Sequence, residues 1–309
     1  MNFAAAEAIA KTVLYEGYVL YPYRPSAIKN RQRWTFGGVY PRGESSAAEG
    51  GAPLRCECVV EGDSSTRIEI RLRFLHLVTR QVFALGSDGS SFVAVESIGV
   101  NGRTYCTWDE AVEREIRIEP VALTELLARA VSCNFAFAAS AVTEDLRDAS
   151  GIVSGRIVRT QQAIRGRVTA SAAELRSGVC RARIDVENDT PANAPSAHDQ
   201  QALALLSAHV LAGVEGGTFA SLIDPPAHLI PAALGCENDG AWPVLVGEDG
   251  TCDTLLFSPI ILYDWPRVAE ASPGDLFGGN EIDEILTCCS IRSSVAVRKE
   301  RCTWGRAGA

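Results

Sequence analysis

An alternation of apolar and charged residues over 67–75 limits most strongly what this chain can fold into. Ile68, Ile70, Leu72 and Phe74 alternate with charged residues at the positions between them. This period of two places the apolar side chains on one face of an extended strand and the charges on the other. The pattern therefore predicts a strand with one buried face, in a sheet that covers an apolar core.

Runs of similar character recur along the chain and predict several more strands. These runs are residues 54–60, 91–97, 112–118, 152–159, 164–170 and 178–186. The turn-rich residues 61–66 predict an antiparallel hairpin between 54–60 and 67–75. A second hairpin is predicted where residues 244–246 and 254–263 flank GEDGTCD.

Only three segments indicate helices, at residues 3–13, 120–131 and 199–213. The predicted fold class is therefore α+β, with an antiparallel sheet or sandwich-like β core and a few helices. A linker rich in Pro, Asn, Ala and Ser at 188–199 suggests a domain boundary. The expected regions are a β-rich domain with an aromatic and basic N-terminal segment at 1–187, a smaller α+β region at 199–286, and an atypical tail at 287–309.

Composition indicates which classes of partner to exclude and which compartment to expect. The net charge of −9 argues against broad binding to a nucleic-acid backbone, which needs clustered positive charge. The sequence has no run of 18 apolar residues, so it predicts no transmembrane helix. The first ten residues lack the basic and apolar regions of a signal peptide. We therefore expect a cytoplasmic protein with no membrane partner.

No local sequence motif identifies a reaction or a cofactor. The four histidines form no HxH or HExxH pair, and His209 lies in an apolar run that favours a packing role. None of the ten cysteines forms a CxxC pair, so zinc ligation is not indicated and structural thiols are the simpler interpretation. Catalytic residues stay unknown, and we expect neither a cofactor nor a metal site.

The segment at residues 15–42 carries the strongest indication of binding. It holds five of the seven tyrosines together with Trp34 and five basic residues, and Tyr, Trp and Arg dominate the energetic centres of protein interfaces. An aromatic mini-core under an irregular loop is the structural alternative. The predicted partner-binding residues are Tyr18, Tyr21, Tyr23, Arg24, Lys29, Arg31, Arg33 and Trp34.

Two long runs resemble a family of uncharacterised proteins encoded beside actinobacterial-type nickel–iron hydrogenases. They read YEGYVLYPYRPSAIKNRQRWTFGGVYP at 15–41 and WPVLVGEDGTCDTLLFSPIILYDWPRVAEASPGDLFGGNEIDEIL at 242–286. The resemblance implies a link to a hydrogenase subunit or a maturation protein. It supplies no catalytic residues.

The C-terminal sequence departs from that family, whose members continue with an acidic, helix-forming tail. Residues 288–309 contain three cysteines, five basic residues and one acidic residue. We interpret this abrupt shift as a frameshift or altered terminus, with a genuine basic tail as the alternative.

The functional hypothesis that follows is a non-enzymatic accessory or assembly factor that binds a protein partner. The alternative is a metal-handling protein or metal-dependent hydrolase whose Cys, His and Asp ligands converge only in the fold. An enzyme with a site assembled from distant residues stays open as a third possibility.

Overall fold

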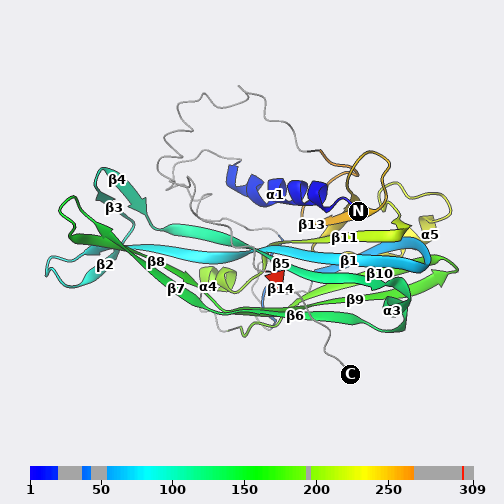
Figure 1. The fold of residues 1–309 in the computed structure, drawn as a ribbon, viewed down its shortest axis with the longest axis horizontal. Helices are drawn as coiled ribbons and strands as arrows, with labels where there is room; N and C mark the ends of the chain where they lie inside the picture. The colour runs from blue at the N-terminus through cyan, green and yellow to red at the C-terminus, as the bar shows by residue number, and fades with distance from the viewer. Residues whose placement is uncertain (20–36, 43–53, 193–195, 268–300, 303–309) are drawn as a thin grey trace.

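A computed structural model describes residues 1–19, 37–42, 54–192, 196–267 and 301–302 of the 309-residue chain (Figure 1). Strands account for 58% of the structure and helices for 11%, so the fold is a mostly antiparallel sheet, as the sequence predicts. In the described part of the chain, no helix has both the length and the apolar character needed to cross a membrane.

One very long strand, β1 (Leu54–Leu85), organises the sheet. Its partners overlap in register, and successive partners alternate between its two edges. Strands β10 (Val179–Asn188), β5 (Trp108–Ala122) and β2 (Phe92–Val95) follow one another along one edge. Strands β11 (Leu206–Phe219) and β8 (Val153–Gln161) follow one another along the other edge.

The remaining strands extend this framework on both sides. Beyond β11 lie β13 (Thr254–Ser258) and β12 (Trp242–Leu245), and beyond β10 lie β9 (Ile164–Arg176) and β6 (Val131–Phe137). Strand β7 (Ser140–Arg147) pairs with β8, and β14 (Arg301–Cys302) pairs in parallel with β5. The short strands β3 (Ser97–Val100) and β4 (Arg103–Cys106) form a separate hairpin.

The main core lies between two layers of this folded sheet (Figure 1). The apolar face of β1, with Ile68, Ile70, Leu72 and Phe74, packs against residues from β6, β9 and β10. The ring of Phe74 lies 5.9 Å from that of Phe135, measured between centroids. The predicted apolar face is confirmed, because Ile68, Ile70, Leu72 and Phe74 are buried. The opposite face is not open to solvent as predicted, because Glu69 and Arg73 are buried as well.

Short helices close the ends and the outer face of the sheet. Helix α1 (Phe3–Val19) begins as predicted and runs past residue 13, and its alanine-rich sequence favours a helix. Its apolar stripe packs on β11, β12 and β13. The other helices in the described part of the chain are α3 (Leu123–Ala128), α4 (Ala197–Ala202) and α5 (Ile230–Leu234).

Three Asp-x-Ser sequences shape tight backbone turns. Asp88 lies between β1 and β2, Asp148 lies between β7 and β8, and Asp63 lies within β1. Each carboxylate accepts the backbone N–H of the serine two residues later, at 2.7–3.1 Å. The hydroxyls of Ser65 and Ser150, and then backbone N–H groups, hold the pKa of Asp63 and Asp148 below the usual value. The backbone N–H groups of Ser91 and then Ser90 lower the pKa of Asp88 most strongly. Such Asx turns explain why the chain bends at these places.

Two predicted elements are wrong. Residues 54–60 and 67–75 do not form a hairpin, because both runs belong to the single strand β1 and continue in the same direction. The first run pairs with β10, and Val60 and the second run pair antiparallel with β11. The intervening residues 63–66 form a bulge in β1, held by the hydroxyl of Thr66, which donates to the carbonyl of Gly216 at 2.8 Å. Excess residues in one strand are accommodated in this way without reversing the chain.

The helix predicted at 199–213 is also wrong over most of its length. Only α4 is helical there, and residues from Leu206 onward form the central strand β11. Both faces of β11 are covered over residues 206–214, so its sequence there is mostly apolar and resembles a buried helix. The helix predicted at 120–131 shrinks to α3 because β5 extends through Ala122.

The other predicted strands are present, including the hairpin of β12 and β13. The division into domains stays a prediction, although strands from both sides of residues 188–199 pair in one sheet.

The packing of α1 on β11 depends on Gly213. A Cβ atom added to this glycine would lie 2.6 Å from Cζ of Phe3, much closer than van der Waals contact. We predict that Gly213→Val displaces the start of α1 and lowers the free energy of unfolding by about 1–3 kcal/mol. The control is Gly99→Val, because nothing lies within 4 Å of a Cβ atom there. Equal urea-unfolding midpoints for the two variants would contradict this packing.

Candidate functional site

The structure describes little of the predicted partner-binding segment. Tyr18 falls within α1, where its side chain is not described. The other seven residues lie outside the described residues: Tyr21, Tyr23, Arg24, Lys29, Arg31, Arg33 and Trp34. Whether this segment binds a partner therefore stays a prediction.

The end of that segment is anchored to the body of the protein. Val39 pairs with Leu205, and the two backbone N–H···O distances are 2.9 and 3.0 Å. Tyr40 packs against the cluster formed by Leu75, Leu77 and Leu206. Arg42 forms an ion pair with Glu187 of β10. The chain is thus fixed at residues 39–42, immediately after the aromatic and basic sequence.

A second candidate surface lies on the projecting end of the sheet, which we call the finger. It comprises β2, β3, β4, β7, β8 and the ends of β1 and β5 nearest to them (Figure 1). One of its two faces packs under the β3–β4 hairpin, around Val82, Val100, Leu146 and Ile157. Gly155 fits closely there, since an added Cβ atom would lie 2.8 Å from Cδ1 of Ile98.

The opposite face of the finger carries apolar and aromatic side chains in register. Phe83 pairs with Ala94 on β2 and with Arg156 on β8, while Leu85 pairs with Phe92. Because directly paired residues share a face of a sheet, these side chains lie together. We call this surface the finger face, and its residues are Phe83, Leu85, Phe92, Ala94, Arg156 and Val158.

The finger face is not part of a core in the described part of the chain. Phe83, Leu85, Phe92 and Val158 are half-buried, and none of them belongs to the five core clusters of the described residues. No sequence pattern used above predicted this surface. The signal that could have found it is the pair of apolar runs VFAL at 82–85 and FVAV at 92–95 around the SDGSS turn.

Arg156 gives the finger face a fixed polar centre. Its guanidinium carbon lies 4.1 Å from the centroid of the Phe92 ring, and its Nε donates to Oδ1 of Asp145 at 2.9 Å. These two contacts restrict the conformations open to the Arg156 side chain. A partner that contacts this face would therefore meet a preorganised surface.

A ladder of ion pairs stiffens the base of the finger. Glu110 of β5 accepts from Arg80 at 3.4 Å and from Arg159 at 3.0 Å, and Arg159 also donates to Glu144 at 3.0 Å. These contacts join β5, β1, β8 and β7 across the sheet. The finger is thus tied to the body through side chains as well as through β1.

A buried polar row lies in the body of the sheet, beneath α1. Arg73 of β1 pairs across the sheet with Glu115 of β5 and with His209 of β11. All three side chains are buried. Glu7 of α1 contributes a carboxylate above them, 3.0 Å from Arg71 and 3.7 Å from Arg73. The helix is therefore held by charge as well as by apolar packing.

Burial sets the protonation of His209. The pKa of His209 is lowered to about 4 by burial, against the effect of its hydrogen bond to the Ser207 carbonyl, and the charge of Arg73 lowers it further. His76 also has a pKa lowered to about 4, by burial and then by the charge of Arg114. Both imidazoles are consequently neutral at pH 7.

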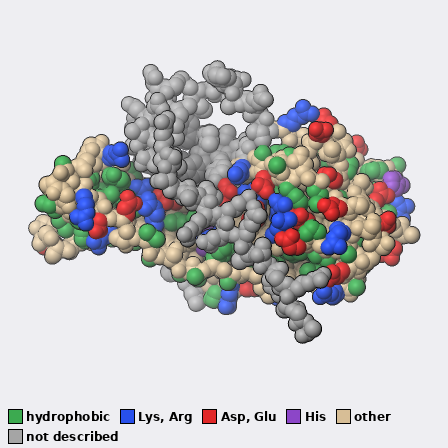
Figure 2. Space-filling view, viewed as in Figure 1, with side chains coloured by type: hydrophobic (Ala, Val, Ile, Leu, Met, Phe, Trp, Pro, Cys, Tyr) green, Lys and Arg blue, Asp and Glu red, His purple; other side chains and the backbone are tan. Residues whose placement is uncertain are grey.

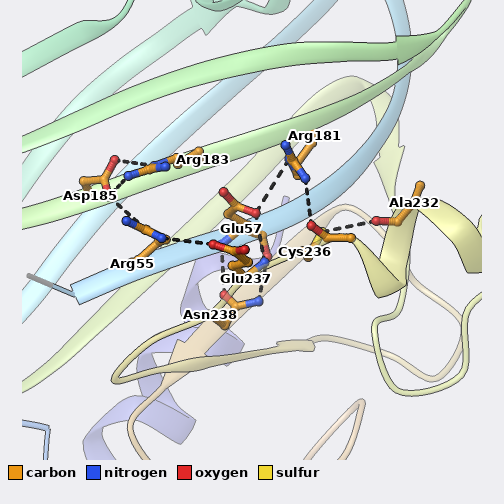
Figure 3. A network of polar contacts seen from close by, with 10 residues as sticks. Arg55, Glu57, Arg181, Arg183, Asp185, Ala232, Cys236, Glu237 and Asn238 are labelled. Carbon is orange, nitrogen blue, oxygen red and sulfur yellow. Dashed lines mark hydrogen bonds and ion pairs between the residues drawn. The ribbon is translucent and has the colours of Figure 1, made fainter.

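A third polar network covers a free edge of β1 (Figure 3). Asn238 accepts the backbone N–H of Glu57 at 2.9 Å and donates to its carbonyl at 3.1 Å. The carboxylate of Glu57 accepts the N–H of Glu237 at 2.9 Å, and Arg55 pairs with Asp239 through the backbone. The loop thereby supplies hydrogen bonds where β11 does not reach, which protects the strand edge.

The charges of this network are matched internally. Arg183 donates to both carboxylate oxygens of Asp185, at 2.7 and 2.9 Å, and Arg181 lies 3.6 Å from Glu57. On the face seen in Figure 2, basic and acidic side chains are likewise interspersed. This arrangement is typical of a structural network rather than of an anion-binding site.

The thiols of Cys56, Cys58 and Cys236 are poor nucleophiles. Burial raises the pKa of Cys56 and Cys58 well above the usual value, and it raises that of Cys236 to about 11. A thiolate is the reactive and metal-binding form of cysteine. Within residues 1–19, 37–42, 54–192, 196–267 and 301–302, no group of three or more His, Cys, Asp or Glu side chains could hold a metal ion.

No model of a known protein family matches the chain, and no curated protein shows significant similarity to it.

The two buried histidines predict an acid-sensitive fold. Each folded-state pKa of about 4 lies below the unfolded value of 6.5, so stability is full above pH 6.5 and falls as the pH drops toward 4. Each histidine therefore lowers the free energy of unfolding by about 2 kcal/mol when the pH falls from 7 to 5.

The test compares wild type with His209→Asn, whose amide can still donate to the Ser207 carbonyl. Urea unfolding at pH 7 and pH 5 gives the change in the free energy of unfolding between the two pH values. In the variant this change should lack the contribution of His209 and keep that of His76. An identical pH dependence in the two proteins would contradict the assignment.

Proposed function

We propose that this chain is a non-enzymatic accessory protein that binds a protein partner, with the finger face as part of its docking surface. The observation that carries the proposal is the row of aromatic and apolar side chains around Arg156 on a projecting sheet. Aromatic residues and arginine are the types enriched at the energetic centres of interfaces.

The sheet gives this surface a low entropic cost of binding. Its side chains stand on paired strands, and Arg156 is already held by Phe92 and Asp145. A partner that docks here orders few additional rotamers, and preorganisation of this kind improves affinity. The rigid finger thus suits a docking element.

Contact through the face is favoured over strand addition at the edge. Strand β7 pairs only with β8 in the described part of the chain, which leaves its other edge available. That strand exposes charged side chains, Glu144, Asp145 and Arg147. Charged residues on an edge strand oppose pairing with another chain.

The segment at 15–42 is proposed as a second contact with the same partner. Its tyrosines and arginines offer large apolar area and carboxylate-pairing groups, and it ends in the anchored residues 39–42. The resemblance to hydrogenase-linked proteins leads us to propose a hydrogenase subunit or a maturation protein as the partner.

The cytoplasm is the proposed compartment. Cys56, Cys58, Cys180, Cys236 and Cys252 are free thiols, and the first two lie on one strand. Reduced thiols are typical of proteins that work in a reducing compartment.

An affinity experiment from the native cell extract tests the proposal. We predict that tagged wild-type protein retains a stoichiometric partner and that Phe83→Ala/Phe92→Ala lowers the amount retained at least tenfold. Removal of two central side chains of an interface commonly costs more than the ~1.4 kcal/mol that a tenfold change requires.

The matched control is Val93→Ala, which alters an exposed residue between the same strands on the opposite face. This variant should retain the partner, and thermal unfolding should show that all three proteins are folded. Equal retention by wild type and the double variant would contradict docking through the finger face. Mass spectrometry of the retained protein decides whether it is a hydrogenase subunit or a maturation protein.

A further inference from the structure

Three polar side chains form one line across the sheet beneath α1. Arg73 is the direct backbone partner of both Glu115 and His209, which lie on the strands to either side. Directly opposed residues of an antiparallel sheet point to the same face, with Cβ atoms about 4.5–5.5 Å apart. The register alone therefore brings the three side chains together.

Each of these side chains has one buried polar atom that has no hydrogen-bond partner among the described residues. These atoms are Oε2 of Glu115, Nη1 of Arg73 and Nε2 of His209. The side chains are 6%, 3% and 0% exposed. Buried polar atoms are almost always paired, and an unpaired one is strongly disfavoured.

Direct contacts within the row are too long to satisfy these atoms. Nη1 of Arg73 lies 3.7 Å from Oε2 of Glu7, and Nε of Arg73 lies 3.9 Å from Oε2 of Glu115. Hydrogen bonds between nitrogen and oxygen fall at about 2.7–3.2 Å. A separate hydrogen-bonding molecule is needed between them.

The tautomer of His209 defines what that molecule must offer. Its Nδ1 lies 2.8 Å from the carbonyl oxygen of Ser207, which can only accept, so Nδ1 carries the proton. Nε2 is then an acceptor, as is Oε2 of Glu115, while Nη1 of Arg73 is a donor. The row requires a molecule with two donors and one acceptor.

We propose that the row Glu115–Arg73–His209 is a buried binding site for ordered water. An anion would face the carboxylates of Glu7, Glu113 and Glu115, and a cation would face the guanidinium of Arg73. Water is neutral, carries two donors and accepts as well, and buried water commonly makes about three such bonds. The contact between α1 and the sheet is consequently dry at Phe3 and Ala6 and hydrated at Glu7.

A crystal structure at a resolution that shows ordered solvent tests this inference. We expect a water molecule within about 3.2 Å of Nε2 of His209 and of Nη1 of Arg73. In His209→Leu crystals the water at that position should be lost. In His198→Leu, where an exposed histidine beside Asp109 is replaced, the water should remain.

Nuclear magnetic resonance supplies a second readout in solution, on wild-type protein alone. The ¹⁵N shift of Nε2 of His209 should be that of an unprotonated nitrogen that accepts a hydrogen bond, and the Arg73 guanidinium protons should show a cross-relaxation signal with water. A well-ordered row without water, or an Arg73 nitrogen in direct hydrogen-bond contact with Nε2, would overturn the proposal.

Discussion

Backbone pairing along both edges of β1 is the interaction on which the rest of the structure depends. This strand has 32 residues, far more than an ordinary strand of five or six. Five strands share its two edges, so the same backbone runs from the two-layered body into the finger. Continuity of this strand makes the finger a rigid extension of the core rather than an independent loop.

The two faces of β1 have different chemistry, and this difference organises the molecule. On one face, apolar side chains fill the core: Ile68, Ile70, Leu72 and Phe74. On the other face lie Glu69, Arg71 and Arg73, which are also largely buried. Burial of these charges is tolerated because carboxylates from α1 and β5 surround the arginines. A charge removed from water is stable only when it is paired in this way.

Local periodicity predicted the strands with one apolar and one polar face and missed the strand that is mostly apolar on both faces. The run at 67–75 alternates because one of its faces carries charge, and the sequence alone reveals that period. Strand β11 lies between β1 and β13 under α1, so its sequence is apolar at nearly every position and carries no period of two. The position of β11 depends on tertiary pairing, which no local pattern records.

The candidate surfaces also differ in whether the sequence alone reveals them. The aromatic and basic segment at 15–42 is visible in composition, whereas the finger face depends on the register that places Phe83 beside Arg156 and Leu85 beside Phe92. The polar row under α1 likewise joins residues 73, 115 and 209, which are distant in sequence. Register between strands cannot be derived from the residues of one strand alone.

Hydrogen–deuterium exchange of the protein, free and with its retained partner, tests the central claim most directly. The account predicts slower exchange in the complex for peptides that cover residues 83–94 and 156–158, and unchanged exchange for β6 on the far layer. Protection confined to β6, β9 and β10, with the finger unaffected, would contradict it.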